Sequence, residues 1–249
     1  MPDIAVSTQA TLPTFSPLYK QIKSLLLKQL DAGVWKAGEV LPSEMELAER
    51  MAVSQGTVRK AVDELVAEHL LLRRQGKGTY VATHSAAGVQ YRFLRLRPDV
   101  GERQPATSAV LSCKLVVAPA MVAQALALEP KGKALQVERT LGFGGKTVVF
   151  ETIYLQPSLF AGLTAERMSN YTGPMYALFE AEFGVSMTRA HEQVRAVAAT
   201  PKLAAALGLS EGAPLLQATR SSFSYNQKIV ELRLAWYVTQ DYYYWSELD

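Results

Sequence analysis

Three short amphipathic stretches followed by a basic, glycine-rich hairpin fill the first third of the chain, and this order restricts the possible fold more strongly than any other feature. Apolar residues recur at i, i+3 and i+4 in each stretch, which predicts three helices with one buried side each. The spacing then changes to that of two short strands around a turn at Gln75-Gly76-Lys77-Gly78. The predicted helices span about residues 17–32, 43–51 and 54–69, and the predicted strands span residues 71–74 and 79–82.

Capping residues place the ends of these helices. Ser16-Pro17 provides an N-cap and a first-turn proline for the first helix, and Gly33 ends it. Ser43, with Glu46 three residues later, forms a capping box at the start of the second helix. A step of only a few residues then leads to the third helix. Two short helices joined by a tight step and followed by a basic hairpin predict a winged helix-turn-helix.

In such a fold the third helix lies in the major groove of DNA, with its N-terminal residues at the base edges. Ser54 and Thr57 suit phosphates at this helix start, and Gln55 can pair with an adenine edge. Arg59 is long enough to reach a guanine, whereas Lys60 is expected to meet the DNA backbone. The alternative is that these are solvated side chains of an ordinary small α+β domain. The residues predicted to contact DNA are Ser43, Glu44, Ser54, Gln55, Gly56, Thr57, Arg59, Lys60, Arg74, Gly76, Lys77, Gly78 and Thr79.

A set of short motifs runs through this region. They are Leu18-Tyr19-Lys20-Gln21-Ile22, Leu41-Pro42-Ser43-Glu44, Leu47-Ala48, Val53-Ser54, Thr57-Val58-Arg59-Lys60-Ala61 and Gly76-Lys77-Gly78-Thr79-Tyr80-Val81. On these motifs residues 17–82 resemble the DNA-binding domain of the GntR family nearly end to end. Two positions depart from the family pattern: Met45 stands where the family usually has a DNA-contacting arginine, and Gln55 replaces a common arginine or lysine. The loss of two cations implies weaker, less salt-dependent binding and a different preferred operator.

Composition limits what the rest of the chain can be. With 249 residues, 49% of them hydrophobic and 20% charged, the chain suits two modest domains, or one large domain, of a soluble globular protein. A net charge of +3 means that DNA binding has to come from the placement of charge rather than from its total. The single cysteine, Cys113, excludes an internal disulfide, and the three histidines lack metal-ligand spacing. No apolar run approaches the roughly 20 residues of a membrane helix, and the N-terminus lacks a signal peptide. We therefore expect a cytoplasmic protein without a membrane partner, cofactor or metal.

A change of pattern divides the chain into segments. We expect a flexible arm over residues 1–14, the winged helix-turn-helix over 15–83, a small-residue linker over 84–90 and a second domain over 91–249. The second domain mixes strands with helices, so the whole chain is expected to be a two-domain α+β protein. Its candidate strands are 91–97, 108–117, 133–143, 146–155, 189–199, 214–224 and 228–239, and its candidate helices are 119–127, 157–161, 173–182 and 201–206.

Several segments of the second domain carry a resemblance of order and spacing. They include Val137-Glu138-Arg139, Val149-Phe150-Glu151-Thr152-Ile153-Tyr154-Leu155, Met175-Tyr176-Ala177-Leu178-Phe179-Glu180, Phe183-Gly184-Val185, Ala205, Leu207-Gly208, Pro214-Leu215-Leu216 and Val230-Glu231 through Tyr237. On these segments residues 91–245 resemble the effector domain of the HutC subfamily, the UTRA domain, whose fold is shared with chorismate lyase. The resemblance implies a central antiparallel sheet flanked by helices, with a ligand pocket beside the sheet.

Relatives that sense sugar phosphates hold the phosphate with an Arg-x-Arg pair and a serine before Leu-Tyr. Arg139 matches the first arginine, but the second falls on Leu141 and the serine on Pro174; the family's late Tyr-Arg pair reads Tyr237-Val238. A phosphate needs such charge-assisted bonds when it is desolvated, so a phosphorylated sugar is not favoured. The residues that remain as effector-binding candidates are Arg139, Glu151, Tyr176, Glu231 and Tyr237. They suit a carboxylate, an amine or an amino-acid-derived ligand.

Some of these residues also have a purely structural interpretation. Glu151 and Glu231 lie between apolar strand residues, so they either contact the ligand, face solvent or pair with Arg139 or Arg233. The aromatic run 242–245 is expected to be a strand that closes a core or a dimer face rather than a binding box. Cys113 is expected to be a buried small residue.

These observations predict a ligand-responsive transcriptional repressor. As a homodimer it would read a palindromic double-stranded operator with two winged helices, and a small-molecule metabolite would shift its DNA affinity in a direction that the sequence leaves open. One alternative is a chorismate-lyase-like enzyme fused to a DNA-binding domain, although the sequence shows no nucleophile–base constellation. A second alternative is a ligand-blind DNA-binding protein.

Overall fold

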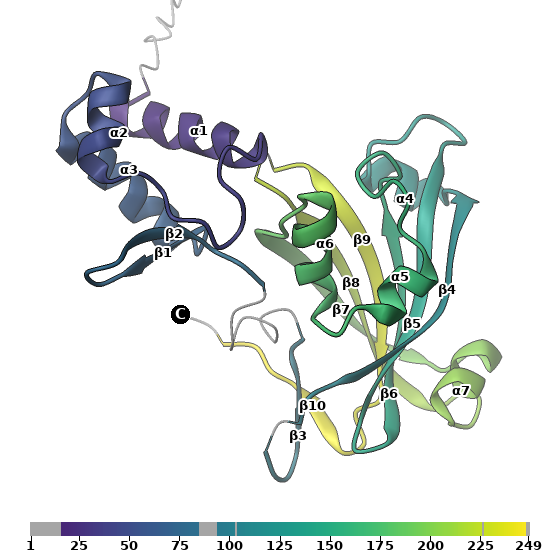
Figure 1. Ribbon diagram of the computed structural model, residues 1–249. Helices are drawn as coiled ribbons and strands as arrows, with labels where there is room; N and C mark the ends of the chain where they lie inside the picture. The colour runs from purple at the N-terminus through teal and green to yellow at the C-terminus, as the bar shows by residue number, and fades with distance from the viewer. Residues whose placement is uncertain (1–15, 85–93, 103, 226, 248–249) are drawn as a thin grey trace, which may run out of the picture.

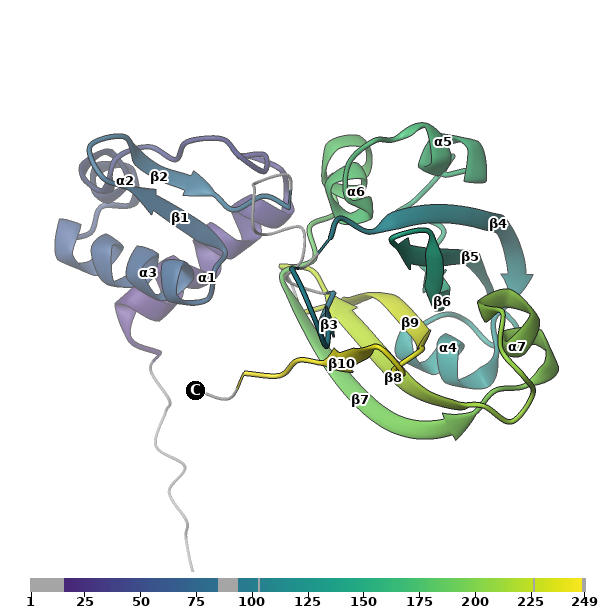
Figure 2. The same ribbon diagram turned by 90° about the horizontal axis from the view of Figure 1, so that it is seen from below.

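The computed structural model describes residues 16–84, 94–102, 104–225 and 227–247, which form two lobes lying side by side (Figures 1 and 2). The expected arm over 1–14 lies outside these residues, as does the expected linker from residue 85 onward. No helix among the described residues is long and apolar enough to cross a membrane.

The N-terminal lobe is built from three helices and a hairpin, as the sequence predicts. Apolar residues of all five elements share one core, in which Leu26, Val58 and Leu65 are fully enclosed. An isolated bridge between Val40 and Tyr80 ties the connector before α2 to the hairpin. The elements are α1 (Leu18–Asp31), α2 (Glu44–Met51), α3 (Gln55–Ala67), β1 (Leu71–Arg74) and β2 (Gly78–Val81).

Capping explains where these helices begin. Ser43 forms the predicted capping box: its Oγ accepts from the N–H of Glu46 at 3.2 Å, and its own N–H donates to Glu46 Oε2 at 2.8 Å. The predicted Ser16 N-cap is wrong, because α1 follows Pro17 directly and has no side-chain cap. The Ser16 carbonyl instead accepts a hydrogen bond from the Gln21 side chain.

The C-terminal lobe contains a six-stranded antiparallel sheet in the order β4-β5-β6-β9-β8-β7. The predicted strands over 133–143 and 146–155 match β5 and β6 at every boundary. The six strands are β4 (Thr107–Val117), β5 (Lys133–Phe143), β6 (Lys146–Leu155), β7 (Arg189–Ala198), β8 (Pro214–Phe223) and β9 (Ile229–Tyr237). The helices of this lobe are α4 (Ala120–Ala125), α5 (Ala165–Asn170), α6 (Met175–Phe183) and α7 (Pro201–Leu207).

Strand alternation decides which helices cover which face of the sheet. On β6, Ile153 belongs to the core beneath α5 and α6, whereas Tyr154 packs with α4 and Phe150 with α7. Side chains one residue apart point to opposite faces, so α5 and α6 cover one face and α4 and α7 the other, as Figure 2 shows. The face under α5 and α6 carries the charged residues described below.

A second, two-stranded sheet pairs β3 (Leu96–Pro98) with β10 (Tyr242–Tyr244). Tyr242 and Tyr244 pack against the core of the large sheet. This confirms the prediction that the aromatic run is a strand that closes a core.

Two predictions for this lobe need correction. The segment predicted as a helix over 157–161 forms a pair of turns. Leu159 and Phe160 donate only to carbonyls three residues earlier, and none of the residues 157–161 is helical. Helix α5 was not predicted: Met168 is its single buried residue, so it has no apolar stripe to read. Its N-cap, Thr164, accepts from the N–H of Arg167 and was the available signal.

Candidate DNA-binding face and effector cavity

The start of α3 is an exposed, capped helix end. Ser54 Oγ accepts from the N–H of Thr57 at 3.2 Å and lies 2.8 Å from Thr57 Oγ1. The first N–H groups of a helix have no acceptor within the helix, and Gln55 and Gly56 are exposed here. This end can therefore accept a DNA phosphate, with the two hydroxyls already engaged in the cap.

Glu44 connects three elements of the candidate DNA-binding face. Its Oε2 accepts from Arg59 Nε at 2.8 Å, and its Oε1 accepts from Arg73 Nη2 at 2.9 Å. Arg73 also pairs with Asp63 on α3 at 2.8 Å. The Arg59 side chain remains 58% exposed, so its terminal nitrogens stay accessible. Glu44 was predicted to contact DNA, and the structure places it as the residue that positions two arginines.

Aromatic rings orient two further basic residues of this face, Lys60 and Arg74. Lys60 Nζ lies 4.1 Å from the ring centre of Tyr19 on α1, and the Arg74 guanidinium lies 4.7 Å from that of Tyr80 on β2. Tyr80 also donates to the carbonyl of Lys77 at 3.1 Å, which braces the hairpin turn. The remaining predicted contacts of the hairpin are exposed or half-buried at this turn and comprise Gly76, Gly78 and Thr79.

Gly78 is required by the hairpin geometry. Its φ of +107° lies in the left-handed region, and a Cβ at this position would come within 3.3 Å of the Val40 side chain. Gly76, with φ +69°, completes the turn.

In the C-terminal lobe, a row of buried charges crosses the sheet face beneath α6. Arg139 on β5 is paired in register with Glu151 on β6, and Arg233 on β9 is paired with Arg220 on β8. Arg139 Nε donates to Glu151 Oε2 at 2.6 Å, and Arg233 Nη1 donates to Glu151 Oε1 at 2.9 Å. Burial would raise the pKa of Glu151, but the charges of Arg139 and Arg233 outweigh burial and lower that pKa to about 2. Glu151 therefore stays ionised.

Glu231 neutralises Arg233 from the other side. Its two carboxylate oxygens accept from Arg233 Nε at 3.1 Å and Nη2 at 2.9 Å, and Oε1 also accepts from the Tyr176 hydroxyl at 2.8 Å. Burial raises the pKa of the Tyr176 hydroxyl, which keeps it protonated as a donor. Arg220 has a separate partner, because it donates to Glu192 on β7 at 2.7 Å.

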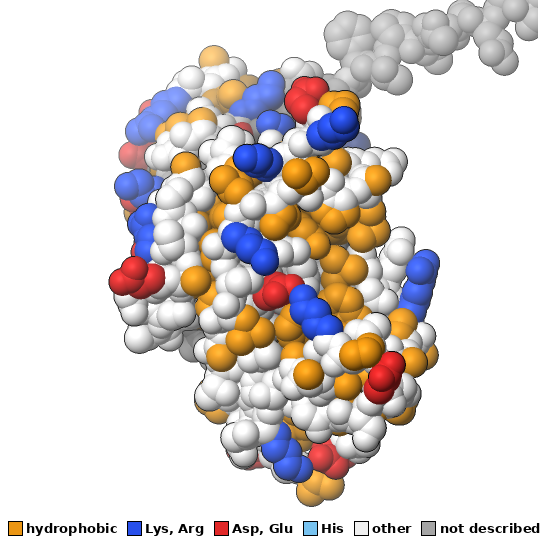
Figure 3. Space-filling model, turned by 90° about the vertical axis from the view of Figure 1, so that its right-hand side faces the viewer, with side chains coloured by type: hydrophobic (Ala, Val, Ile, Leu, Met, Phe, Trp, Pro, Cys, Tyr) orange, Lys and Arg blue, Asp and Glu red, His pale blue; other side chains and the backbone are white. Residues whose placement is uncertain are grey.

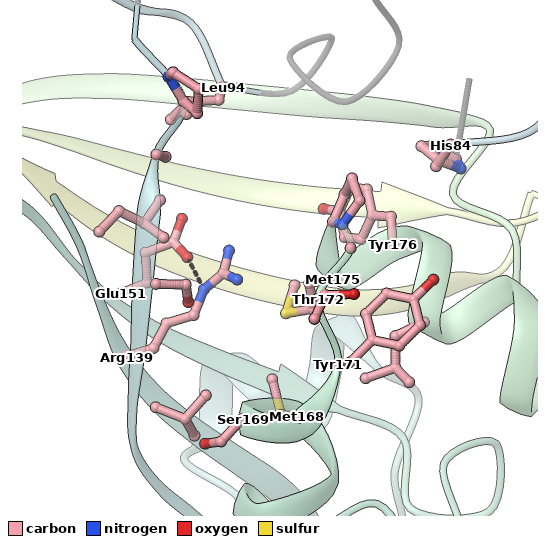
Figure 4. A pocket seen from close by; sticks show the side chains of 18 of the residues that line it. His84, Leu94, Arg139, Glu151, Met168, Ser169, Tyr171, Thr172, Met175 and Tyr176 are labelled. Atoms are coloured by element: carbon pink, nitrogen blue, oxygen red, sulfur yellow. Dashed lines mark hydrogen bonds and ion pairs between the residues drawn. The ribbon is translucent and has the colours of Figure 1, made fainter. Parts of the chain in front are cut away.

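A cavity of about 330 Å³ lies between this row and the segment that contains α5 and the start of α6 (Figure 4). Three of the predicted effector residues, Arg139, Glu151 and Tyr176, line it, whereas Glu231 and Tyr237 are fully buried and are not among its lining residues. Sequence reasoning missed two cationic lining residues, Arg220 and Arg233, and the segment that closes the cavity. The lining residues of that segment are Met168, Ser169, Tyr171, Thr172, Gly173, Pro174 and Met175.

The cavity lining holds more arginines than carboxylates. Arg139, Arg220 and Arg233 line the cavity with Glu151, while Glu231 and Glu192, which neutralise Arg233 and Arg220, lie outside the lining. Within the described part of the chain, Arg139 donates its hydrogen bond through Nε alone. Its two terminal nitrogens point into the cavity (Figure 4). Apart from His84, the rest of the wall is apolar or hydroxyl-bearing, so the cavity presents a cationic spot on an otherwise weakly polar surface.

Two other features bear on the chemistry. Among the described residues, no group of three His, Cys, Asp or Glu side chains is placed to hold a metal ion. Cys113 is half-buried, with Sγ 3.6 Å from the Leu163 carbonyl, and burial raises the pKa of its thiol. The thiol is therefore held in its protonated, less reactive form.

Comparison with known families and structures assigns both lobes. Residues 18–81 match the family of bacterial regulatory proteins called gntR, and residues 102–243 match the UTRA domain. In solved structures, the ligand-binding domain of a GntR-family transcriptional regulator from Bordetella bronchiseptica is 42% identical, with a TM-score of 0.62. That comparison covers 64% of this chain and 99% of the other.

Curated relatives extend over both lobes. An HTH-type transcriptional regulator of Mycobacterium tuberculosis is 30% identical over 237 residues, which cover 92% of this chain and 83% of the relative. The mannosyl-D-glycerate transport/metabolism system repressor of Escherichia coli is 26% identical, with coverage of 91% and 93%. The histidine utilization repressor of Pseudomonas putida is 26% identical, with coverage of 88% and 87%. The chain therefore belongs to the gntR family of bacterial regulatory proteins, as a DNA-binding transcriptional regulator whose C-terminal domain is a UTRA domain.

Proposed function

We propose that this protein is a repressor that binds its operator through α3 and the β1–β2 hairpin, and that a small anion in the UTRA cavity modulates this binding. The Arg139 guanidinium carries the proposal: its terminal nitrogens point into the cavity, whereas Arg220 and Arg233 are paired with Glu192 and Glu231. A desolvated anion needs charge-assisted donors of this kind. Because the relatives are regulators, we assign binding rather than catalysis to the cavity. Because the proposed partner of the protein is genomic DNA, we place the protein in the cytoplasm.

The cavity chemistry favours a carboxylate over an amine. Glu151 already accepts from two arginines, so an ammonium group would meet cations before it met an open acceptor. Leu141 and Pro174, which stand where sugar-phosphate sensors have an arginine and a serine, both line the cavity. Together with Met168 and Met175 they suit an apolar or aromatic body. The ligand class is therefore a small carboxylate with a hydrophobic body.

Two matched probes test this ligand class. Benzoate is expected to raise the Tm of the protein, and benzylamine, which has the same ring and the opposite charge, is expected to leave it unchanged. Arg139→Gln should abolish the benzoate shift. A shift with benzylamine, or a benzoate shift that survives Arg139→Gln, would refute a carboxylate site at this position.

We also propose a homodimer on a palindromic operator. The molecular face that carries β4 and α4 gathers apolar side chains (Figure 3). Leu111, Leu115 and Val117 on the edge strand β4 and Met121 on α4 are exposed large hydrophobic residues. An exposed sheet edge with apolar neighbours is suited to burial against a second copy, and a two-fold dimer would present two α3 helices to two half-sites.

DNA binding is tested with fragments from the upstream region of the gene that encodes the protein, by fluorescence anisotropy. Arg59→Ala should weaken specific binding by roughly 1–3 kcal/mol. Arg195→Ala, which removes an exposed arginine on β7 of the other lobe, is the matched control and should leave affinity unchanged. Equal affinities for wild type and Arg59→Ala, across a panel of genomic fragments, would reject the assignment of α3 as the reading helix.

A further inference from the structure

The junction between the hairpin and the expected linker, Thr83–His84, is clamped onto the effector domain by a single buried carboxylate. Glu180 on α6 accepts three hydrogen bonds: from Thr83 Oγ1 at 3.0 Å, from the His84 backbone N–H at 2.9 Å and from His84 Nδ1 at 2.6 Å. An ionised carboxylate only accepts, so Nδ1 carries the hydrogen. The side chains of Glu180 and His84 are 4% and 8% exposed. Thr83 and His84 lie two and three residues after Val81, the last residue of β2, so this clamp holds the end of the hairpin.

Helix α6 joins the clamp to the cavity. Tyr176 lines the cavity, and Glu180 lies four residues later on the same side of the helix. The His84 ring also lines the cavity and packs edge-on against the Tyr176 ring, with centroids 5.4 Å apart. A ligand in the cavity therefore meets a residue that is continuous with the DNA-binding lobe.

A second contact joins the lobes beside the clamp. Tyr225, in the turn between β8 and β9, packs against the core of the N-terminal lobe, and its hydroxyl is hydrogen-bonded to Ser186. Of these two contacts, the clamp borders the cavity through His84, whereas Tyr225 is not among the cavity's lining residues.

We propose that Thr83–His84 is a movable part of the cavity wall, and that Glu180 and Tyr176 transmit cavity occupancy to the DNA-binding hairpin. A bound anion would displace the rings of His84 and Tyr176, tilt α6 and change the hold of Glu180 on the end of β2. Glu180 is a positioning residue in this scheme, and His84 contacts the ligand. The inference rests on the proposed effector site and adds its route to the DNA-binding lobe.

Hydrogen exchange in the full chain tests the clamp without DNA or ligand. Glu180→Gln and Glu180→Ala should both speed exchange of the peptide 78–84 by about tenfold, because the His84 amide loses its acceptor. Glu182→Gln, on the same helix but in an exposed pair with Arg167, is the matched control and should change nothing. Unchanged exchange in both Glu180 variants would overturn the clamp. If Glu180→Ala fails to fold, Glu180→Gln decides.

The coupling between the cavity and the clamp is tested by a substitution at Tyr176, on the cavity side of α6. Tyr176→Phe removes the hydroxyl that donates to Glu231 but leaves the clamp residues intact. It should still speed exchange at 78–84, whereas Tyr171→Phe, another cavity tyrosine that lies off α6, should not. Hydrogen exchange of the β5–β6 peptide must stay constant in both tyrosine variants. This control separates coupling between the cavity and the clamp from a general loss of stability. If the two variants behave alike at 78–84, the transmission route is wrong.

Benzoate separates this inference from the proposed ligand class. In the wild type, benzoate should raise Tm and alter hydrogen exchange at 78–84. In Glu180→Gln it should still raise Tm but leave hydrogen exchange at 78–84 unaltered. If benzoate raises Tm in the wild type but leaves exchange at 78–84 untouched, the route is wrong and the ligand class stands. If benzoate has no effect on Tm, the carboxylate class fails, and the Tyr176→Phe comparison alone decides the route.

Discussion

Glu44 and Arg59 form an ion pair of 2.8 Å that joins the start of α2 to the first turns of α3. The same carboxylate holds Arg73 of the hairpin, so one acidic residue fixes the spacing of two cations on the candidate DNA-binding face. A negative charge close to DNA costs affinity, and its presence here is explained by the orientation that it gives to the arginines.

Glu44→Gln should therefore reduce specificity while increasing general DNA affinity. Without the carboxylate, Arg59 loses its partner and Arg73 keeps only Asp63, so nonspecific, salt-dependent binding rises and specific binding falls. We expect the ratio of specific to nonspecific affinity to drop by about tenfold, or roughly 1.4 kcal/mol. Anisotropy titrations on operator and scrambled DNA measure this ratio, with Glu49→Gln on the exposed side of α2 as control. A preserved ratio would mean that Glu44 does not orient Arg59.

Met45→Arg should strengthen DNA binding. Met45 is 60% exposed on α2, at the position where GntR-family domains usually carry a DNA-contacting arginine. One added phosphate contact should steepen the plot of log affinity against log salt by about 0.9. Val194→Arg, at an exposed valine on β7 in the other lobe, controls for net charge. If both variants change the salt slope equally, position 45 does not face DNA.

Glu151→Gln should lower stability in a pH-dependent way. The pKa of Glu151 is about 2 in the folded protein and near 4.5 when unfolded, so its contribution is fully present above about pH 4.5 and is lost as the pH falls toward 2. At neutral pH the variant should unfold about 3 kcal/mol more easily, since Arg139 and Arg233 lose their shared partner. Urea unfolding between about pH 6 and pH 2 should show the gap to wild type closing. The exposed Glu211→Gln should show no such gap, and a constant gap for Glu151→Gln would contradict the ion-pair assignment.

Leu115→Lys should disrupt the proposed homodimer. Leu115 is exposed on β4, and a charge there would have to be desolvated at an interface between two copies. Sedimentation should show a monomer, and operator affinity should fall because the two half-sites would be read separately. Val194→Lys, on the opposite edge strand β7, should keep the wild-type association state. If both variants sediment like the wild type, a different face mediates association.

Local signals carried most of the fold prediction, and long-range packing explains where it failed. The capping box at Ser43, the alternating burial along β5 and the continuous buried run of β6 depend on neighbouring residues, so the sequence predicts them closely. Helix α5 is six residues long with one buried residue, Met168, and has no periodicity to detect. A helix that short takes its stability from the sheet below it, which local sequence does not show.

The effector cavity was predicted only in part for a similar reason. Arg139 and Glu151 were found through resemblance, and their pairing was one of the interpretations that the sequence left open. Arg220 and Arg233 meet across β8 and β9, and only the register of those two strands brings them to the cavity. Glu180 carried no signal, because its partners at residues 83 and 84 are nearly a hundred positions away.

The cavity is made of two parts that can change independently. Its floor is a set of interlocked charges on β5, β6, β8 and β9, where altering one residue leaves a neighbour's charge unpaired inside the protein. Its roof is the segment 168–175, whose side chains line the cavity and bear no charge. Substitutions in the roof can therefore reshape the recognised molecule while the proposed preference for an anionic group persists. A lineage built on this scaffold would diversify among ligands that share one charged end and differ in the remainder.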